Sequence, residues 1–243
     1  MLYSSVENSR IKGYKKLHSK KYRDEEGLFF VEGEHLIQEA YKTKALSVLI
    51  LKEGIKFDLD VETIYVSDVV MKYLSNLETI PTMIGICKKQ TAGEIKGNVV
   101  LLEDIQDPGN LGTIIRSAVA FNIDTIILSK SSVDPYNEKV IRATQGLIFH
   151  INIIIGDLKE AISTLKHQKY DIIGTTVNNE KQSNIVRKNS KYALLLGNEG
   201  SGISLDTSNI CDELVYINMN DKCESLNVAV AASIILYELD KQV

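Results

Sequence analysis

The sequence predicts an α/β protein in which a small N-terminal α/β domain precedes a larger domain with a mostly parallel sheet. Short Val, Ile and Leu runs of strand length recur along the chain, and helical patterns lie between most of them. The runs in the second half are apolar almost throughout, which is typical of parallel strands with helices on both faces. A polar stretch with two glycines lies between the halves, so we expect domains at 1–92 and 98–243 joined by a linker at 93–97.

The length and composition set wide bounds on what the protein does. A chain of 243 residues holds one large domain or two modest ones, and its composition is that of an ordinary globular protein. The net charge of -4 argues against a uniformly basic protein that coats nucleic acid, although a local basic patch is compatible with it. No run is apolar enough to span a bilayer and the start lacks a signal peptide's core, so we expect a cytoplasmic protein without membrane contact.

Cysteines and histidines are few and scattered in this chain. We therefore expect no disulfide framework and no metal site. The residues concerned are Cys87, Cys211, Cys223, His18, His35, His150 and His167.

The first segment is basic. Seven Lys and Arg residues, His18 and two tyrosines lie between Arg10 and Arg23, with no acidic residue among them. A thin apolar stripe through this segment predicts a helix. Its charges are either a solvated face or a set of phosphate contacts, and the acidity of the whole chain favours the second interpretation. The candidate nucleic-acid contacts, including one from a later helix start, are Arg10, Lys12, Lys21, Arg23 and Arg142.

The rest of the first domain alternates strands and helices, as a small α/β domain does. Strands are predicted at 28–31, 48–51, 63–66 and 83–87, and helices at 35–42 and 68–76.

The second domain begins a more regular alternation. Its predicted strands are 99–102, 125–128, 151–155, 171–174, 193–196 and 214–217. A polar loop leaves the first of these strands and enters a helix, where Asn110 is well placed as the N-cap and Arg116 falls off the apolar face. A polar stretch before Arg142 is interpreted as loop and cap residues, and the alternative is that Asn137 and Arg142 lie near a ligand.

The last fifty residues hold the candidate pocket. Two apolar strands end in polar loops, at 197–203 and 218–227, and the second loop opens a long apolar helix pattern. Loops at the carboxyl ends of buried strands are where open α/β sheets bind ligands. Gly197, Gly200 and Gly202 would allow close backbone approach to a ligand or a positive φ. The alternative is two glycine turns beside a buried helix.

Three common enzyme classes are disfavoured by the motifs. The three glycines are spaced G-x-x-G-x-G, which is not the dinucleotide-binding G-x-G-x-x-G. The sequence has no P-loop Gly-Lys-Ser/Thr and no G-x-S-x-G nucleophile elbow. A dehydrogenase, an NTPase and a serine hydrolase are therefore poor candidates.

Three segments carry a resemblance to a known family. Residues 107–116 (DPGNLGTIIR), 196–204 (LGNEGSGIS) and 217–228 (INM and ESLNV) resemble, in order and spacing, the motifs of SpoU/TrmH-type RNA 2′-O-ribose methyltransferases of the SPOUT superfamily. The first 92 residues are similar to the family's RNA-binding domain, which resembles a small ribosomal protein. Two positions depart from the pattern, because His35 stands where Arg is usual and Asn218 where Pro is usual.

This resemblance implies a catalytic domain with a deep trefoil knot, which physical rules alone would not propose. It also implies a homodimer and S-adenosylmethionine as cofactor, held in a bent form by the backbone of Gly197, Ile217 and Leu226. Implied around the entering ribose are the catalytic residues Asn110, Arg116, Glu199, Ser225 and Asn227.

The implied reaction moves a methyl group to a ribose 2′-oxygen, whose proton must leave near the transition state. Family schemes give this role to Arg116, but a guanidinium stays charged, so Arg116 is alternatively an electrostatic clamp. Glu199 is a second candidate proton acceptor. Ribosomal RNA is favoured over transfer RNA by analogy. The alternatives are a tRNA 2′-O-methyltransferase, a non-catalytic RNA-binding protein that retains the cofactor fold, or a resistance determinant with the same chemistry.

Overall fold

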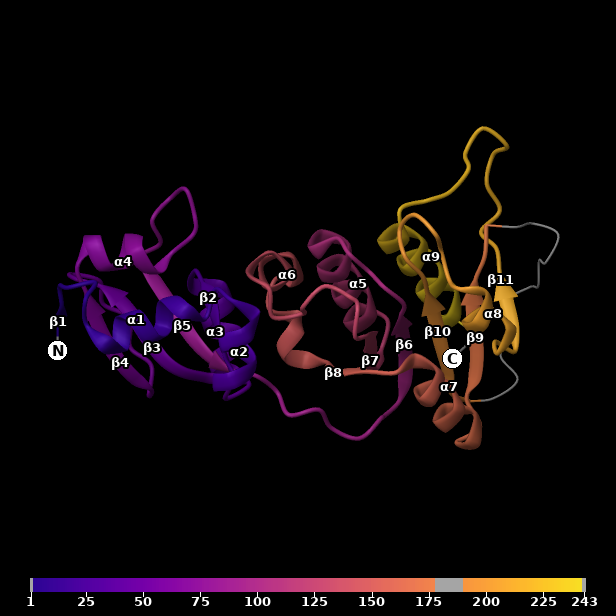
Figure 1. The fold of residues 1–243 in the computed structure, drawn as a ribbon, viewed down its shortest axis with the longest axis horizontal. Coiled ribbons are helices and arrows are strands. Elements are labelled where there is room, and N and C mark those ends of the chain that lie inside the picture. Colours follow the sequence, from indigo (N-terminus) through magenta and orange to yellow (C-terminus); the bar gives the residue numbers. More distant parts are fainter. Residues whose placement is uncertain (1, 178–189, 242–243) are drawn as a thin grey trace. The chain divides into compact units, whose positions relative to one another are not determined.

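A computed structural model describes residues 2–177 and 190–241, which form two compact units (Figure 1). The first unit contains the chain up to Thr91 together with Asp134–His150, and the second contains Ala92–Val133 and the chain from Ile151 onward. The segment Asp134–His150 thus packs with the N-terminal part, although it lies in the middle of the sequence. The boundaries 1–92 and 98–243 stay a prediction about the protein's domains.

The first unit has a mixed five-stranded sheet in the order β1-β4-β3-β5-β2. β4 is parallel to β1 and β3, whereas β5 is antiparallel to both β3 and β2. Four strands match the predicted runs; the fifth, β1, has only two residues, too few for a periodicity to reveal. Their bounds are β1 (Leu2–Tyr3), β2 (Leu28–Glu32), β3 (Leu46–Lys52), β4 (Glu62–Val66) and β5 (Met83–Lys88).

The basic segment forms two short helices, so the prediction of one helix there is wrong. The chain turns at 17–19, where Leu17 is buried and the amides of residues 17–19 donate to carbonyls three residues back. Arg23 donates to the carbonyls of Leu17 and His18, at 2.8 Å each, and so satisfies groups that the broken helix leaves free. The helices of this unit are α1 (Ser9–Lys16), α2 (Lys20–Glu26), α3 (Glu34–Lys42), α4 (Asp68–Leu74), α6 (Glu138–Thr144) and the 3₁₀ helix η1 (Leu147–His150).

The second unit has a six-stranded sheet in the order β11-β9-β10-β6-β7-β8, and every pair in it is parallel. This confirms the predicted parallel sheet. β11 ends at Val215, opposite the last residue of its only neighbour β9, so Ile217 lies in the following loop and not in a strand as predicted. The strands are β6 (Asn98–Leu102), β7 (Ile123–Ser129), β8 (Asn152–Gly156), β9 (Asp171–Thr175), β10 (Tyr192–Leu196) and β11 (Glu213–Val215).

The helices of the second unit start at side-chain caps. Asp107, not Asn110 as predicted, caps α5: its carboxylate accepts the Asn110 N–H at 2.8 Å, and a proline takes the first helical position. This leaves the Asn110 side chain free for other contacts. Asn227 caps α9. The helices are α5 (Pro108–Ala120), α7 (Leu158–His167), α8 (Leu205–Asn209) and α9 (Val228–Asp240).

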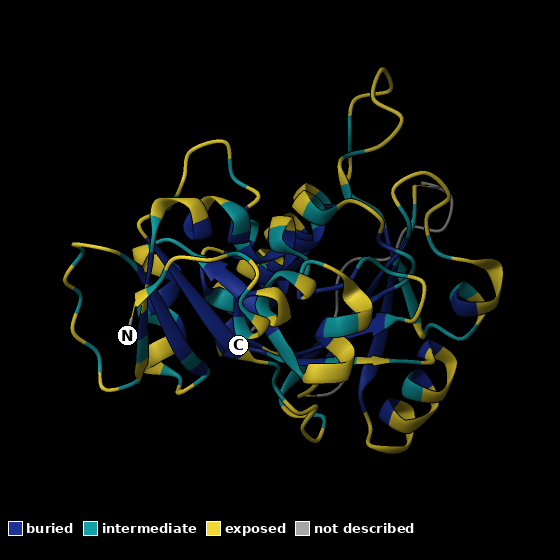
Figure 2. Cartoon of the chain, turned by 60° about the vertical axis from the view of Figure 1, so that its left-hand side comes forward, coloured by how far each residue is buried: buried dark blue, intermediate teal, exposed yellow. Residues whose placement is uncertain are grey.

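Each unit has its own apolar core. Strands β3 and β5 of one sheet and β6 and β10 of the other are largely buried, and the outward faces of the helices are exposed (Figure 2). All five residues of β10 are buried, as expected for a central parallel strand covered on both faces. In the described ranges, no helix is both long and apolar enough to cross a membrane.

Candidate active site

The site lies at the carboxyl edge of the second sheet. β11, β9, β10 and β6 are consecutive neighbours and parallel, so the loops that follow them meet at one edge. A pocket of about 460 Å³ opens there, within the size range of small-molecule sites. Its lining comes from four segments of the described chain, at 175–177, 196–208, 214–219 and 224–235.

Gly197 is required by the loop after β10 itself. A Cβ at Gly197 would lie 2.0 Å from the carbonyl carbon of Gly202 and 2.1 Å from the amide nitrogen of Ile203. Asn198 and Gly202 exchange backbone hydrogen bonds of 3.0 and 2.9 Å, and Gly202 has a φ of +68°. The two glycines therefore close the loop on itself, and in this way they shape the pocket floor.

Glu199 ties this loop to the start of α5. Its carboxylate accepts the N–H of Asp107 at 3.0 Å, the Nδ2 of Asn110 at 3.1 Å and the N–H of Gln106 at 3.2 Å. Burial alone would raise the pKa of this carboxyl, but the hydrogen bonds, that from Asp107 first, outweigh burial and lower the pKa. Glu199 is therefore an ionised anchor at neutral pH.

Asn110 extends the connection to the last helix. Its Oδ1 accepts from the Nδ2 of Asn227 at 2.8 Å. The Oδ1 of Asn227 in turn accepts the first amides of α9. Asn110 thus joins two segments that lie 89 and 117 residues further along the chain, at Glu199 and at Asn227.

The structure places most of the other expected site residues in the pocket lining. Gly197, Ile217, Leu226 and Ser225 line the pocket, as does Glu199. The lining is largely apolar side chains and loop backbone with carboxylates nearby, which suits an adenosine and a sulfonium cation.

Arg116 lies apart from this group. It is exposed on α5, and among the described residues no hydrogen bond or ion pair joins it to Asn110, Glu199, Ser225 or Asn227. The expected catalytic residues therefore divide into the connected cluster Glu199–Asn110–Asn227, Ser225 in the pocket lining and the exposed Arg116.

Two parts of the pocket were not predicted from the sequence. Thr175, Thr176 and Val177 contribute at the end of β9, and Leu205 and Ser208 contribute from α8. The rule that ligands bind at the carboxyl ends of parallel strands would have pointed to the end of β9, since this strand was predicted. The α8 residues carry no such signal.

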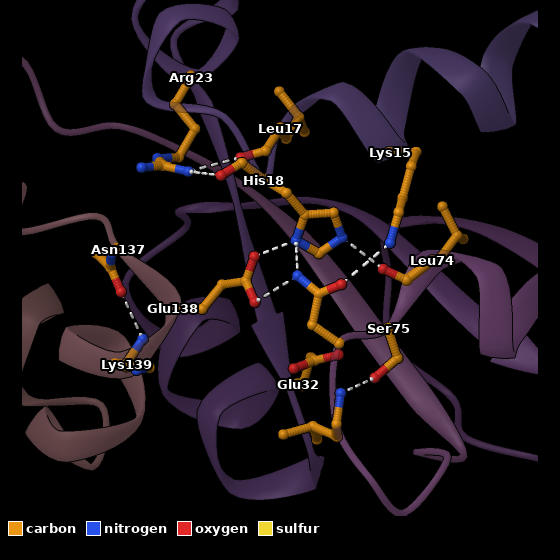
Figure 3. A network of polar contacts seen from close by, with 12 residues as sticks. Lys15, Leu17, His18, Arg23, Glu32, Leu74, Ser75, Asn137, Glu138 and Lys139 are labelled. Carbon is orange, nitrogen blue, oxygen red and sulfur yellow. Dashed lines mark hydrogen bonds and ion pairs between the residues drawn. The ribbon is translucent and has the colours of Figure 1, made fainter.

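Arg23, a candidate RNA contact, is buried in the first unit. Its guanidinium pairs with Asp134 at 2.6 Å, and the two side chains are 5% and 7% exposed. Figure 3 shows the guanidinium directed at the carbonyls of Leu17 and His18. Its donors are engaged by the protein, and breaking such a buried pair typically costs about 3–5 kcal/mol. We therefore assign Arg23 to the fold of this unit.

Arg142 belongs to a polar network in the same unit. Its guanidinium lies 3.8 Å from Glu32, whose other oxygen, Oε1, has no hydrogen-bond partner among the described residues. Burial raises the pKa of Glu32, and the charge of Glu138 adds to this rise. Glu138 itself contacts His18 (Figure 3), and the His18 ring stacks on that of Phe30. Arg142 is thus a partly exposed cation beside a buried carboxylate.

The remaining candidate RNA contacts lie on the surface of α1 and α2. Arg10 pairs with Glu62 at 2.7 Å, so its charge is largely compensated. Lys12 and Lys21 are exposed. In the described part of the chain, no three His, Cys, Asp or Glu side chains are grouped as a metal ion would require.

Two family models and a curated relative match this sequence. The model of the SpoU rRNA methylase family matches residues 97–237, and that of the MRM3-like substrate-binding domain matches residues 8–85. The chain is 34% identical to the 23S rRNA (guanosine(2553)-2′-O)-methyltransferase RlmP of Bacillus subtilis, over 97% of each chain.

Solved structures show the same fold. An AdoMet-bound rRNA methyltransferase from Sinorhizobium meliloti superposes with a TM-score of 0.87 at 24% identity, covering 100% of this chain and 98% of that one. The SpoU methyltransferase AviRb from Streptomyces viridochromogenes, in complex with AdoMet, gives 0.85 at 23% identity, with 97% and 98% covered. On the match of the family model and the near full-length similarity to RlmP, the chain belongs to the SpoU rRNA methylase family.

Proposed function

We propose that this protein is an S-adenosylmethionine-dependent methyltransferase that modifies a ribose 2′-hydroxyl in 23S ribosomal RNA. The observation that carries the proposal is that Glu199, which lines the pocket, is hydrogen-bonded to Asn110, and Asn110 to Asn227, so that all three motif segments are joined beside one pocket. Family membership and the named activity of the Bacillus subtilis relative support ribosomal RNA as the substrate. The cytoplasm, where ribosomes are made, is the proposed location.

The cofactor would be held by loop backbone in the pocket. Gly197, from the loop after β10, and Ile217 and Leu226, from the loop between β11 and α9, line it. S-adenosylmethionine supplies the methyl group when bound. The rigid loop at Gly197 fixes the position of the donor, and alignment of reacting atoms contributes as much as about 7–11 kcal/mol in favourable cases.

Arg116 is proposed to act on the ribose side of the reaction. A guanidinium carries a permanent positive charge, so Arg116 would stabilise the developing alkoxide and the neighbouring phosphate, while the proton of the 2′-hydroxyl passes to solvent water. Its exposure on α5 leaves it accessible to RNA.

Glu199 is proposed to hold the site together. Three protein N–H groups already donate to its carboxylate, and their effect is to lower its pKa. Both properties make it a poor proton acceptor, and both favour a role in placing Asn110 next to the pocket.

The first unit is proposed to bind the RNA backbone through the α1–α2 lysine patch, defined as Lys16, Lys20 and Lys21 around Tyr22. All three lysines are exposed, and the ammonium groups of Lys16 and Lys21 lie 5.3 and 5.7 Å from the Tyr22 ring centroid. Lysines bind phosphates, and a neighbouring aromatic ring stacks on unpaired bases.

Replacing the three lysines of this patch with glutamine tests this part of the proposal. RNA affinity should fall, and the slope of log K against log salt should become smaller by about 2, because about three phosphate contacts are lost. A variant with Lys44, Lys56 and Lys72 changed to glutamine, on other segments of the same unit, loses the same charge and serves as the control. Equal losses in both variants would reject a specific patch.

The resemblance also supports two finer proposals, a homodimer and a trefoil-knotted C-terminal segment. α9 exposes Val230, Ile234 and Tyr237, at 47%, 38% and 48%, along one helical stripe. A second copy of the chain would cover this stripe. For the knot, the central position of β10 between β9 and β6 is compatible with threading of the chain that follows.

The deciding experiment is transfer of tritiated methyl from S-adenosylmethionine to total RNA from a strain that lacks the gene. Label should enter 23S rRNA, and primer extension sensitive to 2′-O-methylation should map it to one nucleotide. An RNA fragment with a 2′-deoxy sugar at that nucleotide should bind and remain unmethylated. Label in transfer RNA, or in the deoxy fragment, would overturn the proposed substrate or the proposed acceptor atom.

A further inference from the structure

Asp104, in the loop between β6 and α5, has an unusual backbone conformation. Its φ is +57°, in the left-handed region that favours glycine and that aspartate tolerates at a cost. The resemblance to the family's motifs begins three residues later, at Asp107, and assigns nothing to this position. The backbone strain at this position must be offset by contacts that the surrounding structure makes with Asp104.

The Asp104 side chain joins this loop to the end of β7. Its Oδ1 accepts the hydroxyl of Ser129 at 2.7 Å and the hydroxyl of Ser131. The Asp104 N–H donates back to the Ser129 hydroxyl at 2.9 Å. These hydroxyl donors are the main reason why the pKa of Asp104 is lowered, so the carboxylate is charged at neutral pH.

The Asp104 backbone carbonyl accepts two further hydrogen bonds. It accepts from the Nδ2 of Asn198 at 2.8 Å and from the Nε2 of Gln106 at 3.0 Å. The Gln106 side chain bonds in addition to the carbonyl of Ser131 at 2.9 Å. The loop after β6 is thus fixed on one side to the β7 end and on the other to the loop after β10.

The next residues along this loop hold the site. The amides of Gln106 and Asp107 donate to Glu199, and Asn110 follows in the first turn of α5. A rotation of the loop at Asp104 would move both amides away from the Glu199 carboxylate. Asp104 is not among the residues that line the pocket, so a change of its side chain should not alter the cofactor-binding surface directly.

We infer that Asp104 is a positioning residue for methyl transfer, because its carboxylate, through Ser129 and Ser131, sets the loop that places Glu199 and Asn110. The inference rests on the proposed function. It predicts that the side chain, and not the backbone conformation alone, is needed for turnover.

A series of variants at position 104 separates the two effects. Asp104→Gly accepts the positive φ without strain and removes both acceptor oxygens, whereas Asp104→Asn accepts the same φ and keeps one acceptor. We expect kcat for methyl transfer to fall about tenfold or more in D104G, and D104N to stay within about threefold of the unchanged protein. The Kd for S-adenosylmethionine, from calorimetry, should change by less than about twofold in both.

Two further variants serve as a check and a control. Ser131→Ala combined with D104G should cost no more than D104G alone, because the two changes remove the same contact. Asn122→Gly likewise places glycine at a position with positive φ, +58°, after the end of α5. This control should leave kcat unchanged. D104G with full kcat, or D104N as impaired as D104G, would overturn the inference. If the unchanged protein methylates no RNA, the proposed function fails instead.

Discussion

Glu199 offers a direct test of whether the site works by positioning or by proton transfer. The carboxylate is bound by three N–H donors, and its Oε1 is within 3.0–3.3 Å of all three. Glu199→Gln can therefore keep a carbonyl oxygen in the Oε1 position, with loss of the charge and of one contact at Oε2. Glu199→Ala removes every acceptor at once.

The expected magnitudes follow from these contacts. A hydrogen bond of this kind contributes about 0.5–1.5 kcal/mol net, so loss of three corresponds to about 2–4 kcal/mol, or about 30- to 1,000-fold in kcat/KM for E199A. E199Q should lose only about 1 kcal/mol, or about fivefold. A general base would behave otherwise, since neither glutamine nor alanine accepts the proton and both variants would be equally impaired.

The assay is single-turnover transfer of tritiated methyl to the mapped RNA, measured across pH 5–9. Because the pKa of Glu199 is lowered, its anchoring is present above the ordinary carboxyl value of about 4.3 and is lost as pH falls through the lower folded value. The rate of methyl transfer should therefore show no change that is due to ionisation of Glu199 between pH 5 and 9. Equal losses in E199Q and E199A, or an acidic limb that disappears in E199Q, would refute anchoring.

Further variants probe the pocket, the ribose side and the cysteines. Arg116→Ala should lower transfer by about 100-fold or more while the Kd for S-adenosylmethionine, measured by calorimetry, stays within about twofold; full turnover would reject its role. Gly197→Ala places a Cβ 2.0 Å from the Gly202 carbonyl carbon and should weaken cofactor binding by about tenfold or more, and unchanged binding would contradict the loop geometry. Burial raises the pKa of Cys211 to about 12, so at pH 8 roughly one thiol in ten thousand is ionised. Iodoacetamide followed by peptide mass spectrometry should therefore find exposed Cys223 modified first, and faster labelling of Cys211 would show that this part opens in solution.

Strands and helices of the second unit were predicted well because their signals are local. The sequence segments that form β6, β7 and β10 are largely apolar. This pattern is expected for a strand that is covered on both faces of the sheet. The break between α1 and α2 was missed because it depends on a distant interaction. Arg23 satisfies the carbonyls at the break while Asp134, 111 residues away, binds its charge.

The cap of α5 shows a similar limit. Asp107 and Asn110 are both good capping residues, and the sequence offered no reason to prefer the first. In the folded chain the Asn110 side chain bonds to Glu199 and Asn227, and Asp107 is the residue that caps α5. The choice between the two side chains was made by partners that are about ninety or more residues away.

The sequence by itself determined the α/β class, the parallel second sheet and the two loops, 197–203 and 218–227, that supply part of the pocket lining. These follow from apolar periodicity and from motif spacing, which neighbouring residues encode. Only the tertiary structure decided which polar groups are free to act: it buried Arg23, engaged Glu199 with three donors and left Arg116 exposed. The reason is physical, because the burial and the hydrogen-bond partners of a charged side chain depend on segments that are far apart in the chain and meet only when it folds.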